Sequence, residues 1–328
     1  MKGIPGSKVV LGLYDETPYK TAGASGVRMA FSQFNPQNQQ ARRASEVLSG
    51  YYGNARGVLG NKGVSGNLGT ELGPETIGWL LKHLIGTPTT AAAGTAFHHT
   101  FAVGEGALDI PDGFTAEEDF GTALASATHR VMRYIGCRLG SGALNFGTDG
   151  FIGSSFDFLG ADAQPFASPL DAALTDLGHT SFSVSNTGIV LSSGAAIPTC
   201  FRALALNFTN ELDPDFFCLT GGGVRDDLPR SKFGVAVQGT ALFDSDDLLK
   251  QTLADTDASL VTTVQRGTGD GTAGNEKLVI TIPAMTFTPA SVPVQGPRGL
   301  TLQANGTAHR TAGEIGITAE LWNPQATL

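Results

Sequence analysis

The residues that could do chemistry in this sequence are few, and their spacing assembles no reactive site. His98 and His99 are the only adjacent histidines, and neighbouring residues of a strand point to opposite faces, so only one of them could ligate a given metal ion. Asp244, Asp246 and Asp247 lack the glycine and the distal glutamate of a calcium loop, which favours a role at the start of a helix. The pattern therefore predicts no metal site and no cofactor.

The sequence motifs of common enzymes are also missing. There is no Gly-x-Ser-x-Gly motif to present a nucleophilic serine. The glycine-rich residues 267–274 lack the Lys-Ser/Thr pair of a phosphate-binding loop and are interpreted as a turn between strands. The acidic residues 117–119 have no partner cluster at a predictable distance, so paired-carboxylate hydrolysis has no support. These observations argue against an enzyme, and no catalytic residue is predicted.

The composition favours a turn-rich protein built from many short strands. The 328 residues include 44 glycines and 16 prolines but only 16% charged residues, unlike a helical bundle. The formal net charge of −9 argues against a protein that grips nucleic acid, because phosphate binding needs clustered cations. No run of about 18 apolar residues is present to span a membrane, so we expect no membrane partner.

Apolar and polar residues alternate along much of the chain, as in strands with one buried face, and only two segments have the periodicity of a helix. These are residues 75–86 and residues 245–254. The side chains expected to pack the two helices are Ile77, Trp79, Leu80, Leu81, Leu248 and Leu249. Lys82 and His83 fall on the polar side of the first helix, where we expect a solvated or subunit-facing edge.

The two helices belong to an internal repeat. In each half a strand carrying Gly-Thr-x-Leu comes before the helix, at residues 69–72 and at residues 239–242, and further strands follow it. We therefore predict two tandem modules. The first occupies residues 1–161 and the second residues 199–328, and a connecting segment covers residues 162–198.

Several short segments stand in a distinctive order along most of the chain. They are residues 6–21, 60–67, 77–82, 86–90, 134–138, 150–157 and 293–300. Taken as an ordered set, they resemble the major tail tube proteins of long-tailed bacteriophages with flexible, non-contractile tails (the siphovirus type). Residues 104–127 and 162–198 are less familiar in that comparison.

The resemblance implies a mainly β fold of two tandem β-sandwich modules, each with one flanking α-helix. Proteins that look like this assemble into stacked rings whose inner sheets join into a β-barrel-lined tube, through which genomic DNA passes into the host. An acidic lumen is implied as well, since like charge repels phosphate. The partners implied are further copies of the chain, the tape-measure protein and DNA in the lumen, and tail-terminator and tail-tip proteins. The implied location is the virion tail, assembled in the host cytoplasm.

The repeat also gives an expected copy number, because three chains with two modules each would form a trimeric ring of pseudo-sixfold symmetry. A hexameric ring is the alternative. Two long polar loops, residues 35–60 (the first arm) and residues 213–230 (the second arm), are expected to bridge neighbouring subunits or stacked rings, or to be mobile solvated loops in the free monomer. The charged residues expected at these contacts are Arg42, Arg43 and Arg56 in the first arm and Asp213, Asp215, Asp226 and Asp227 in the second.

Two other classes of protein stay open. A tail-tip or carbohydrate-binding β-sandwich module would need an exposed aromatic platform, for which two tryptophans and five tyrosines give little support. An inner-tube protein of a contractile tail shares the module but works inside a sheath. Rings or hollow rods in the electron microscope would favour a tube protein, whereas a dispersed monomer that binds glycans would favour the binding module.

Overall fold

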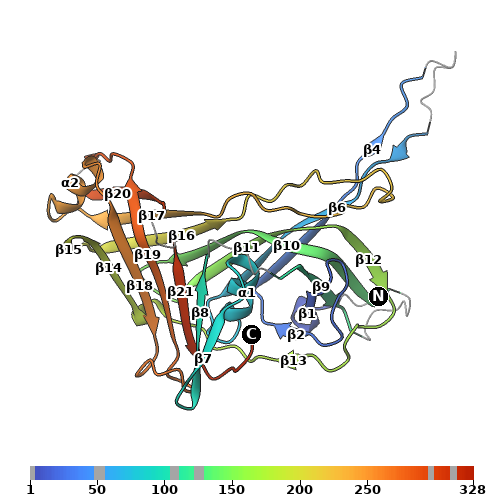
Figure 1. Cartoon of the computed structure of the whole chain (residues 1–328), viewed down its shortest axis with the longest axis horizontal. Coiled ribbons are helices and arrows are strands. Elements are labelled where there is room, and N and C mark those ends of the chain that lie inside the picture. The colour runs from blue at the N-terminus through green and yellow to red at the C-terminus, as the bar shows by residue number, and fades with distance from the viewer. Residues whose placement is uncertain (1–3, 48–55, 104–110, 122–128, 295–298, 311–315) are drawn as a thin grey trace.

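The computed structural model is mainly β, with two α-helices, α1 (Ile77–Leu84) and α2 (Asp247–Leu253), among the residues it describes. The described residues are 4–47, 56–103, 111–121, 129–294, 299–310 and 316–328. Both helices lie inside the ranges predicted from periodicity, and the predicted mainly β class is confirmed (Figure 1). Large open sheets account for most of the ordered chain, as in a β-sandwich.

Strands from the first half of the chain form one group of sheets. They are β1 (Val10–Glu16), β2 (Val27–Met29), β3 (Gln33–Gln39), β6 (Gly63–Glu71), β9 (Gly113–Asp119), β10 (Val131–Phe146), β11 (Gly153–Gly160) and β12 (Asp162–Phe166). One sheet has the order β2, β1, β9, β10, β12, and the other has the order β10, β11, β6, β3. All of these pairs are antiparallel, and β10 takes part in both sheets.

Strands from the second half form another group. They are β14 (Thr187–Ser193), β15 (Ala195–Ile197), β16 (Phe201–Thr209), β17 (Gly234–Leu242), β18 (Ala258–Gln265), β19 (Lys277–Phe287), β20 (Thr301–Ala308) and β21 (Thr318–Asn323). One series has the order β15, β14, β18, β19, β21, and the other has the order β19, β20, β17, β16. These pairs are also antiparallel, and β19 takes part in both series.

The long strands β10 and β19 carry the same irregularity. The pairing of β10 with β9 shifts between Tyr134 and Cys137, and the pairing of β19 with β18 shifts between Ile282 and Met285. Such a bulge adds a residue to one strand and increases its local twist. Each bulge lies where its strand passes from one set of neighbours to the next.

Two contacts join the groups into one body. The last six residues of β10 pair with β16, so that the sheet runs without a break from β3 to β20. The hairpin of β7 (Thr89–Ala93) and β8 (Ala96–Ala102) follows α1 and pairs through β8 with β21. The short elements that remain are η1 (Gly6–Lys8), β4 (Arg42–Arg43), β5 (Val58–Leu59), β13 (Thr175–Asp176) and η2 (Val184–Asn186).

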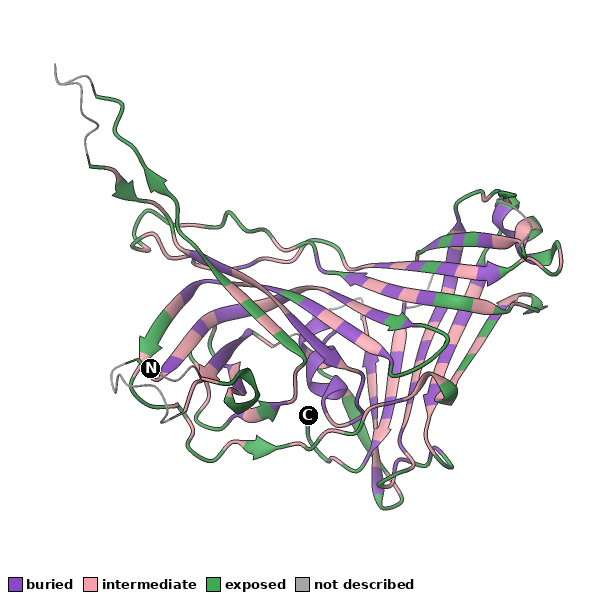
Figure 2. Cartoon of the chain, turned by 180° about the vertical axis from the view of Figure 1, so that it is seen from behind, coloured by how far each residue is buried: buried purple, intermediate pink, exposed green. Residues whose placement is uncertain are grey.

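The core lies on one face of the continuous sheet, against the helices. Along its strands every second residue is buried, as the alternating colours of Figure 2 show. Leu144, Phe156, Leu206 and Phe208 are at most 1% exposed. Each such side chain contributes roughly 1.5–3 kcal/mol of hydrophobic free energy when it leaves water. This burial fixes the register, because a one-residue slip would turn every apolar side chain to the other face.

Three details differ from what the sequence suggested. The Gly-Thr-x-Leu segments are not in register, because Leu72 is fully buried while Leu242 is 38% exposed. His83 is 4% exposed and not on a solvated edge. The stretch taken as a connecting segment, residues 162–198, contains β12, β13, η2, β14 and β15, several of which belong to the main sheets.

Candidate functional site: a polar sheet face and two arms

The face of the continuous sheet opposite the core is exposed and polar. It crosses seven neighbouring strands in the order β3, β6, β11, β10, β16, β17 and β20. We call it the polar face. Cross-strand pairing puts the following side chains on this side: Gln33, Asn35, Gln37, Gln39, Ser65, Asn67, Glu71, Ser155, Asp157, Leu159, Arg138, Ser141, Ala143, Asn145, Ala203, Ala205, Asn207, Thr209, Ala236, Gln238, Thr240, Leu242, Thr301, Gln303, Asn305 and Thr307. The alternation of apolar and polar residues in the sequence predicted strands with one exposed face, but it did not show that seven strands share the same face.

The polar face carries two carboxylates, and the one cation at its paired positions, Arg138, is ion-paired with Asp227 at 2.9 Å. Asp157 accepts hydrogen bonds from Asn67 Nδ2 and from Ser141 Oγ, both at 2.7 Å. Glu71, at the margin, accepts a hydrogen bond from Ser181. Most of the other side chains are amides, hydroxyls or small, so the face offers water many weak partners and offers an anion few cations.

The second arm lies along one end of this face and is bonded to the first half of the same chain. The Lys62 backbone N–H donates to the carbonyl of Gly223 at 2.6 Å. Arg138 forms an ion pair with Asp227 at 2.9 Å and donates to the carbonyl of Leu228 at 2.6 Å. Leu228, a residue of the arm itself, is fully buried. The second arm is thus a folded part of the unassembled chain.

Arg225 holds the middle of the second arm in place. It is 3% exposed, and it donates from Nη1 to the carbonyl of Gly160 at 2.6 Å and from Nε to the carbonyl of Pro214 at 2.8 Å. Burial lowers the pKa of this guanidinium below its usual range. A buried cation bound by carbonyl oxygens is costly to leave without those partners.

The base of the second arm clamps the end of α1. Arg230 donates from Nη2 to the carbonyls of His83 and Leu84, both at 2.9 Å. Asn210, three residues before the arm, donates to the carbonyl of Leu84 at 3.1 Å and to that of Leu139 at 2.9 Å. The last carbonyls of a helix have no partners inside the helix, so these bonds act as a C-terminal cap supplied from the other half of the chain. Burial and the nearby Arg138 lower the pKa of Arg230 to about 10.

The first arm, which joins the paired strands β3 and β6, does not fold onto the chain as the second arm does. Beyond β3 it leaves the body as a thin hairpin (Figure 1), held by the pairing of Arg42 with Leu59 and of Arg43 with Val58. Val58 and Leu59 are 68% and 56% exposed. Among the described residues, neither these two arginines nor Arg56 forms an ion pair, and Arg42 donates to the carbonyl of Gly57 at 2.9 Å. Residues 48–55 of this arm lie outside the described residues.

The aspartates of the second arm therefore meet cations of their own chain. Asp226 lies 3.8 Å from Lys20 Nζ, and Asp227 pairs with Arg138. Asp213 accepts a hydrogen bond from the backbone N–H of Asp215 at 3.0 Å. Within one chain the structure does not bring these aspartates to the arginines of the first arm.

The side chains named for helix packing lie in or against the core. In α1, Ile77, Trp79, Leu80 and Leu81 are at most 3% exposed. In α2, Leu248 is 4% exposed, and Leu249 is partly buried against the same core.

A charged cluster at α1 was missed by the sequence analysis. Asp15 on β1 accepts from Lys82 Nζ at 2.6 Å and lies 2.8 Å from Nε2 of His83. Burial opposes ionisation of Asp15, but the bonds to His83 and Lys82 outweigh it and lower its pKa to about 2. For His83, burial disfavours the protonated ring and therefore lowers its pKa. Helical periodicity placed Lys82 and His83 on the polar side of the helix, and only the fold brings β1 beside them.

The histidine pair serves packing. His98 stacks on Trp322 with ring centroids 4.1 Å apart and lies 3.1 Å from Glu320. His99 is fully buried, on the opposite side of β8, and hydrogen bonds to Thr90 and Asn323. Within the described parts of the chain no group of three or more His, Cys, Asp or Glu side chains is placed to hold a metal ion.

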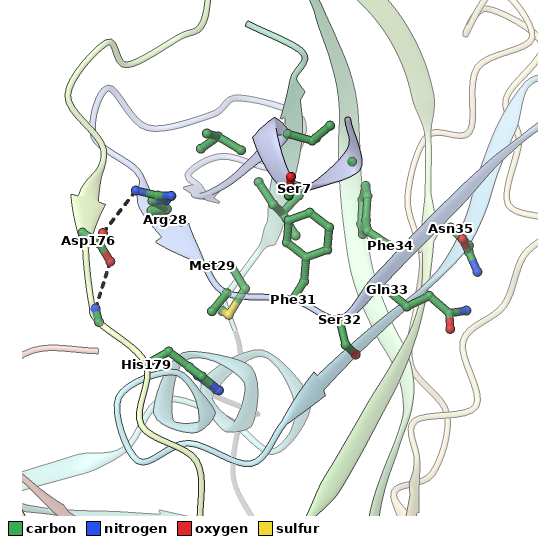
Figure 3. Close-up of a pocket in the computed structure, with 16 residues that line it drawn as sticks. Ser7, Arg28, Met29, Phe31, Ser32, Gln33, Phe34, Asn35, Asp176 and His179 are labelled. Atoms are coloured by element: carbon green, nitrogen blue, oxygen red, sulfur yellow. Dashed lines mark hydrogen bonds and ion pairs between the residues drawn. The ribbon is translucent and has the colours of Figure 1, made fainter. Parts of the chain in front are cut away.

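A pocket beside β3 offers no reactive constellation either (Figure 3). Met29, Phe31 and Phe34 contribute to its lining, and Arg28 and Asp176 form an exposed ion pair there at 3.3 Å. An exposed pair of this kind contributes little energy and activates no nucleophile. In the part of the chain that the structure describes, no helix has the length and hydropathy needed to cross a membrane.

Extended sheets, a broad polar face and one projecting arm, without a reactive site among the described residues, are features of a structural protein. The chain matches the family described as phage tail tube protein over residues 6–308, nearly its whole length, and it belongs to that family. The resemblance inferred from the ordered segments is thereby confirmed at the level of the family, whose members are structural proteins of the virion tail. No curated protein matches the chain.

Proposed function

We propose that this protein forms the tail tube of a long-tailed phage of the siphovirus type by stacking into rings, and that genomic DNA passes along the polar face. The polar face is the observation that carries this proposal. A duplex moving through a tube has phosphates directed at the wall, and each wall cation would bind it by releasing condensed counterions. The paired positions of this face carry two carboxylates, and their one arginine, Arg138, is ion-paired with Asp227 of the second arm, so the face gives DNA little to hold. The protein then needs no catalytic activity and no cofactor.

The two groups of strands are, in this proposal, two copies of one module. The eight strands of the first group can be matched, in chain order, with the eight strands of the second group: β1, β2, β3, β6, β9, β10, β11 and β12 with β14, β15, β16, β17, β18, β19, β20 and β21. Each of the seven strand pairings of the first group then has a counterpart in the second. The bulges in β10 and β19 fall at matching places. The modules would then span residues 10–166 and 187–323, with the β7–β8 hairpin as an addition to the first.

Two modules in a chain favour a ring of three chains with pseudo-sixfold symmetry, and a hexameric ring is the alternative. The pairing of β10 with β16 supplies the pattern for the junctions between chains. Its counterpart would join the end of β19 of one chain to β3 of the next. In keeping with this, β3 is paired on one side only among the described strands, by β6. Such closure would hide an edge that otherwise invites uncontrolled pairing.

Assembly is tested first by electron microscopy of the purified chain, in which we expect rings or hollow rods. A dispersed monomer at every concentration would contradict a tube and would favour the tail-tip or glycan-binding alternative. A sheath around tubes in the native particle would assign the protein to a contractile tail.

The role of the polar face is tested by giving it cations. The variant Asn207→Lys/Gln238→Lys/Asn305→Lys should still assemble, because all three side chains are on the solvent side of the sheet. We expect its tubes to retain short duplex DNA on sedimentation at low salt and to release it at high salt, while wild-type tubes retain none. Val190→Lys, on an exposed position of β14 outside the polar face, is the matched control. Equal retention by both variants would contradict a lumen lined by the polar face.

A further inference from the structure

The second arm shows how an arm is seated on a module. It lies over the end of α1, where Arg230 and Asn210 bind the last carbonyls, and its aspartates face the cations Lys20 and Arg138. An acidic arm, with four aspartates and two arginines in residues 213–230, thus covers a basic edge.

The matching place at the end of α2 is uncovered. Leu253, the last residue of α2, is 61% exposed, and Asp255 and Asp257 after it are also exposed. Asp257 is 3.1 Å from His309 of the strand region beside it, and Asp255 faces solvent. The end of α2 is therefore an acidic surface with an apolar side chain at its centre.

We propose that the first arm of a second copy of this chain docks on the end of α2, as the second arm docks on the end of α1. This inference rests on the proposed assembly into rings. The first arm has three arginines against one glutamate, Glu46, so its charge is opposite to that of the surface at Asp255 and Asp257. Docking would also cover Val58 and Leu59, which solvent surrounds in the single chain.

Position along the strands identifies which residues would meet. Leu59 stands four residues before the first residue of β6, and Arg230 stands four residues before the first residue of β17. When the buried residues Leu248, Gln251 and Thr252 of α2 are matched with the buried Ile77, Leu80 and Leu81 of α1, Leu84 corresponds to Asp255. Because Arg230 contacts Leu84, its counterpart Leu59 is expected beside Asp255 of the neighbouring chain.

A disulfide across this contact tests the proposal. Cys200 and Cys218 are exposed, so both are first replaced by serine, while the buried Cys137 is kept. In that background, Leu59→Cys combined with Asp255→Cys should form disulfides between chains of assembled rings upon mild oxidation. The matched control combines Leu59→Cys with Asp246→Cys at the other end of α2, where no disulfide is expected.

The size of the cross-linked product shows whether the first arm docks on a chain of the same ring or on a chain of a stacked ring. A covalent product that stops at the number of chains in one ring supports docking on a neighbour within the ring. Intact rings without cross-links would overturn the proposal, and so would a ladder extending beyond one ring, which would mean that the arm reaches a stacked ring. Complete absence of rings would overturn the proposed tube function, and with it this docking.

Exchange of charge provides a second readout. Arg42→Glu/Arg43→Glu and Asp255→Lys/Asp257→Lys should each raise the protein concentration needed for assembly by about tenfold or more, and the combined variant should recover most of the loss. The control is Asp244→Lys/Asp246→Lys, at the start of α2. Combined with the first-arm variant, it should not restore assembly. Rescue by this control but not by the Asp255 variant would overturn the proposed surface.

Discussion

The first arm joins β3 to β6, the second arm joins β16 to β17, and the two differ in what they touch. The second arm is folded onto the first half of its own chain, and its residues Arg225 and Leu228 are buried. The first arm stands away from the body with its arginines and apolar side chains in water (Figure 1). The difference teaches that the second arm finds within its own chain the contacts that the described part of the first arm lacks. In the proposed ring, the first arm would find such contacts on the next chain.

The largest expected difference between the arms is in proteolysis. Trypsin should cut the unassembled chain after Arg42, Arg43 or Arg56 at least about 100-fold faster than after Arg225 or Arg230, because the second arm must first open against several hydrogen bonds. Mass spectrometry of the fragments measures both rates. Assembly should then protect the first arm, and equal cleavage of both arms in the monomer would remove the contrast.

The next largest effect concerns the stability of the unassembled chain. Arg225→Met should lower the free energy of unfolding by about 3 kcal/mol, because it removes two charged hydrogen bonds and leaves the buried carbonyl of Gly160 without this partner. Arg56→Met in the first arm should change it by less than about 0.5 kcal/mol. Denaturation in urea measures both, and comparable losses would show that the first arm is also docked in the monomer.

A smaller effect is expected at the base of the arms. Asn210→Ala should cost about 2 kcal/mol, since the buried amide caps α1 through Leu84 and also binds Leu139. Gln40 has the matching place in the first arm and donates to the carbonyl of Gly60 at an exposed site, so Gln40→Ala should be nearly neutral. Unfolding curves of the two variants make the comparison, which fails if their losses are similar.

The smallest effect is a pH dependence at the clamped helix. The pKa of Asp15 is about 2 when folded, below its ordinary 3.8, so its contribution to stability is full above about pH 4 and is lost as the pH falls toward 2. Asp15→Asn should therefore reduce stability at pH 5 and make the unfolding midpoint fall less between pH 4 and pH 2 than in the wild type. Parallel curves for variant and wild type would contradict the coupling of Asp15 to His83 and Lys82.

Local patterns in the sequence were enough to predict the class of fold and the positions of both helices. Alternation predicted strands close to the observed β6, β10 and β19, and the periodicity of Ile77, Leu80 and Leu81 predicted α1. Local patterns could not place long-range neighbours. The clamp on Leu84 involves Asn210 and Arg230, more than 100 residues away, and no spacing rule announces it.

The predicted repeat was based on matching residue identities, and the matched residues do not occupy equivalent positions in the two strands. Gly-Thr-x-Leu recurs at residues 69–72 and 239–242, but Leu72 and Leu242 lie on opposite sides of the sheet. Pairing gives a more physical correspondence, because a strand's neighbours and register decide which face it buries. In the proposed two-module arrangement, the counterpart of β18 is β9, and β8 belongs to the added hairpin.

Electron cryo-microscopy of tubes assembled from the purified chain would test most directly whether two alike modules per chain close into a ring. The account predicts a threefold axis, six similar lobes in cross-section, and Asn207, Gln238 and Asn305 facing the bore. Six chains in a ring, or the polar face turned outward with a bore lined by other strands, would contradict it.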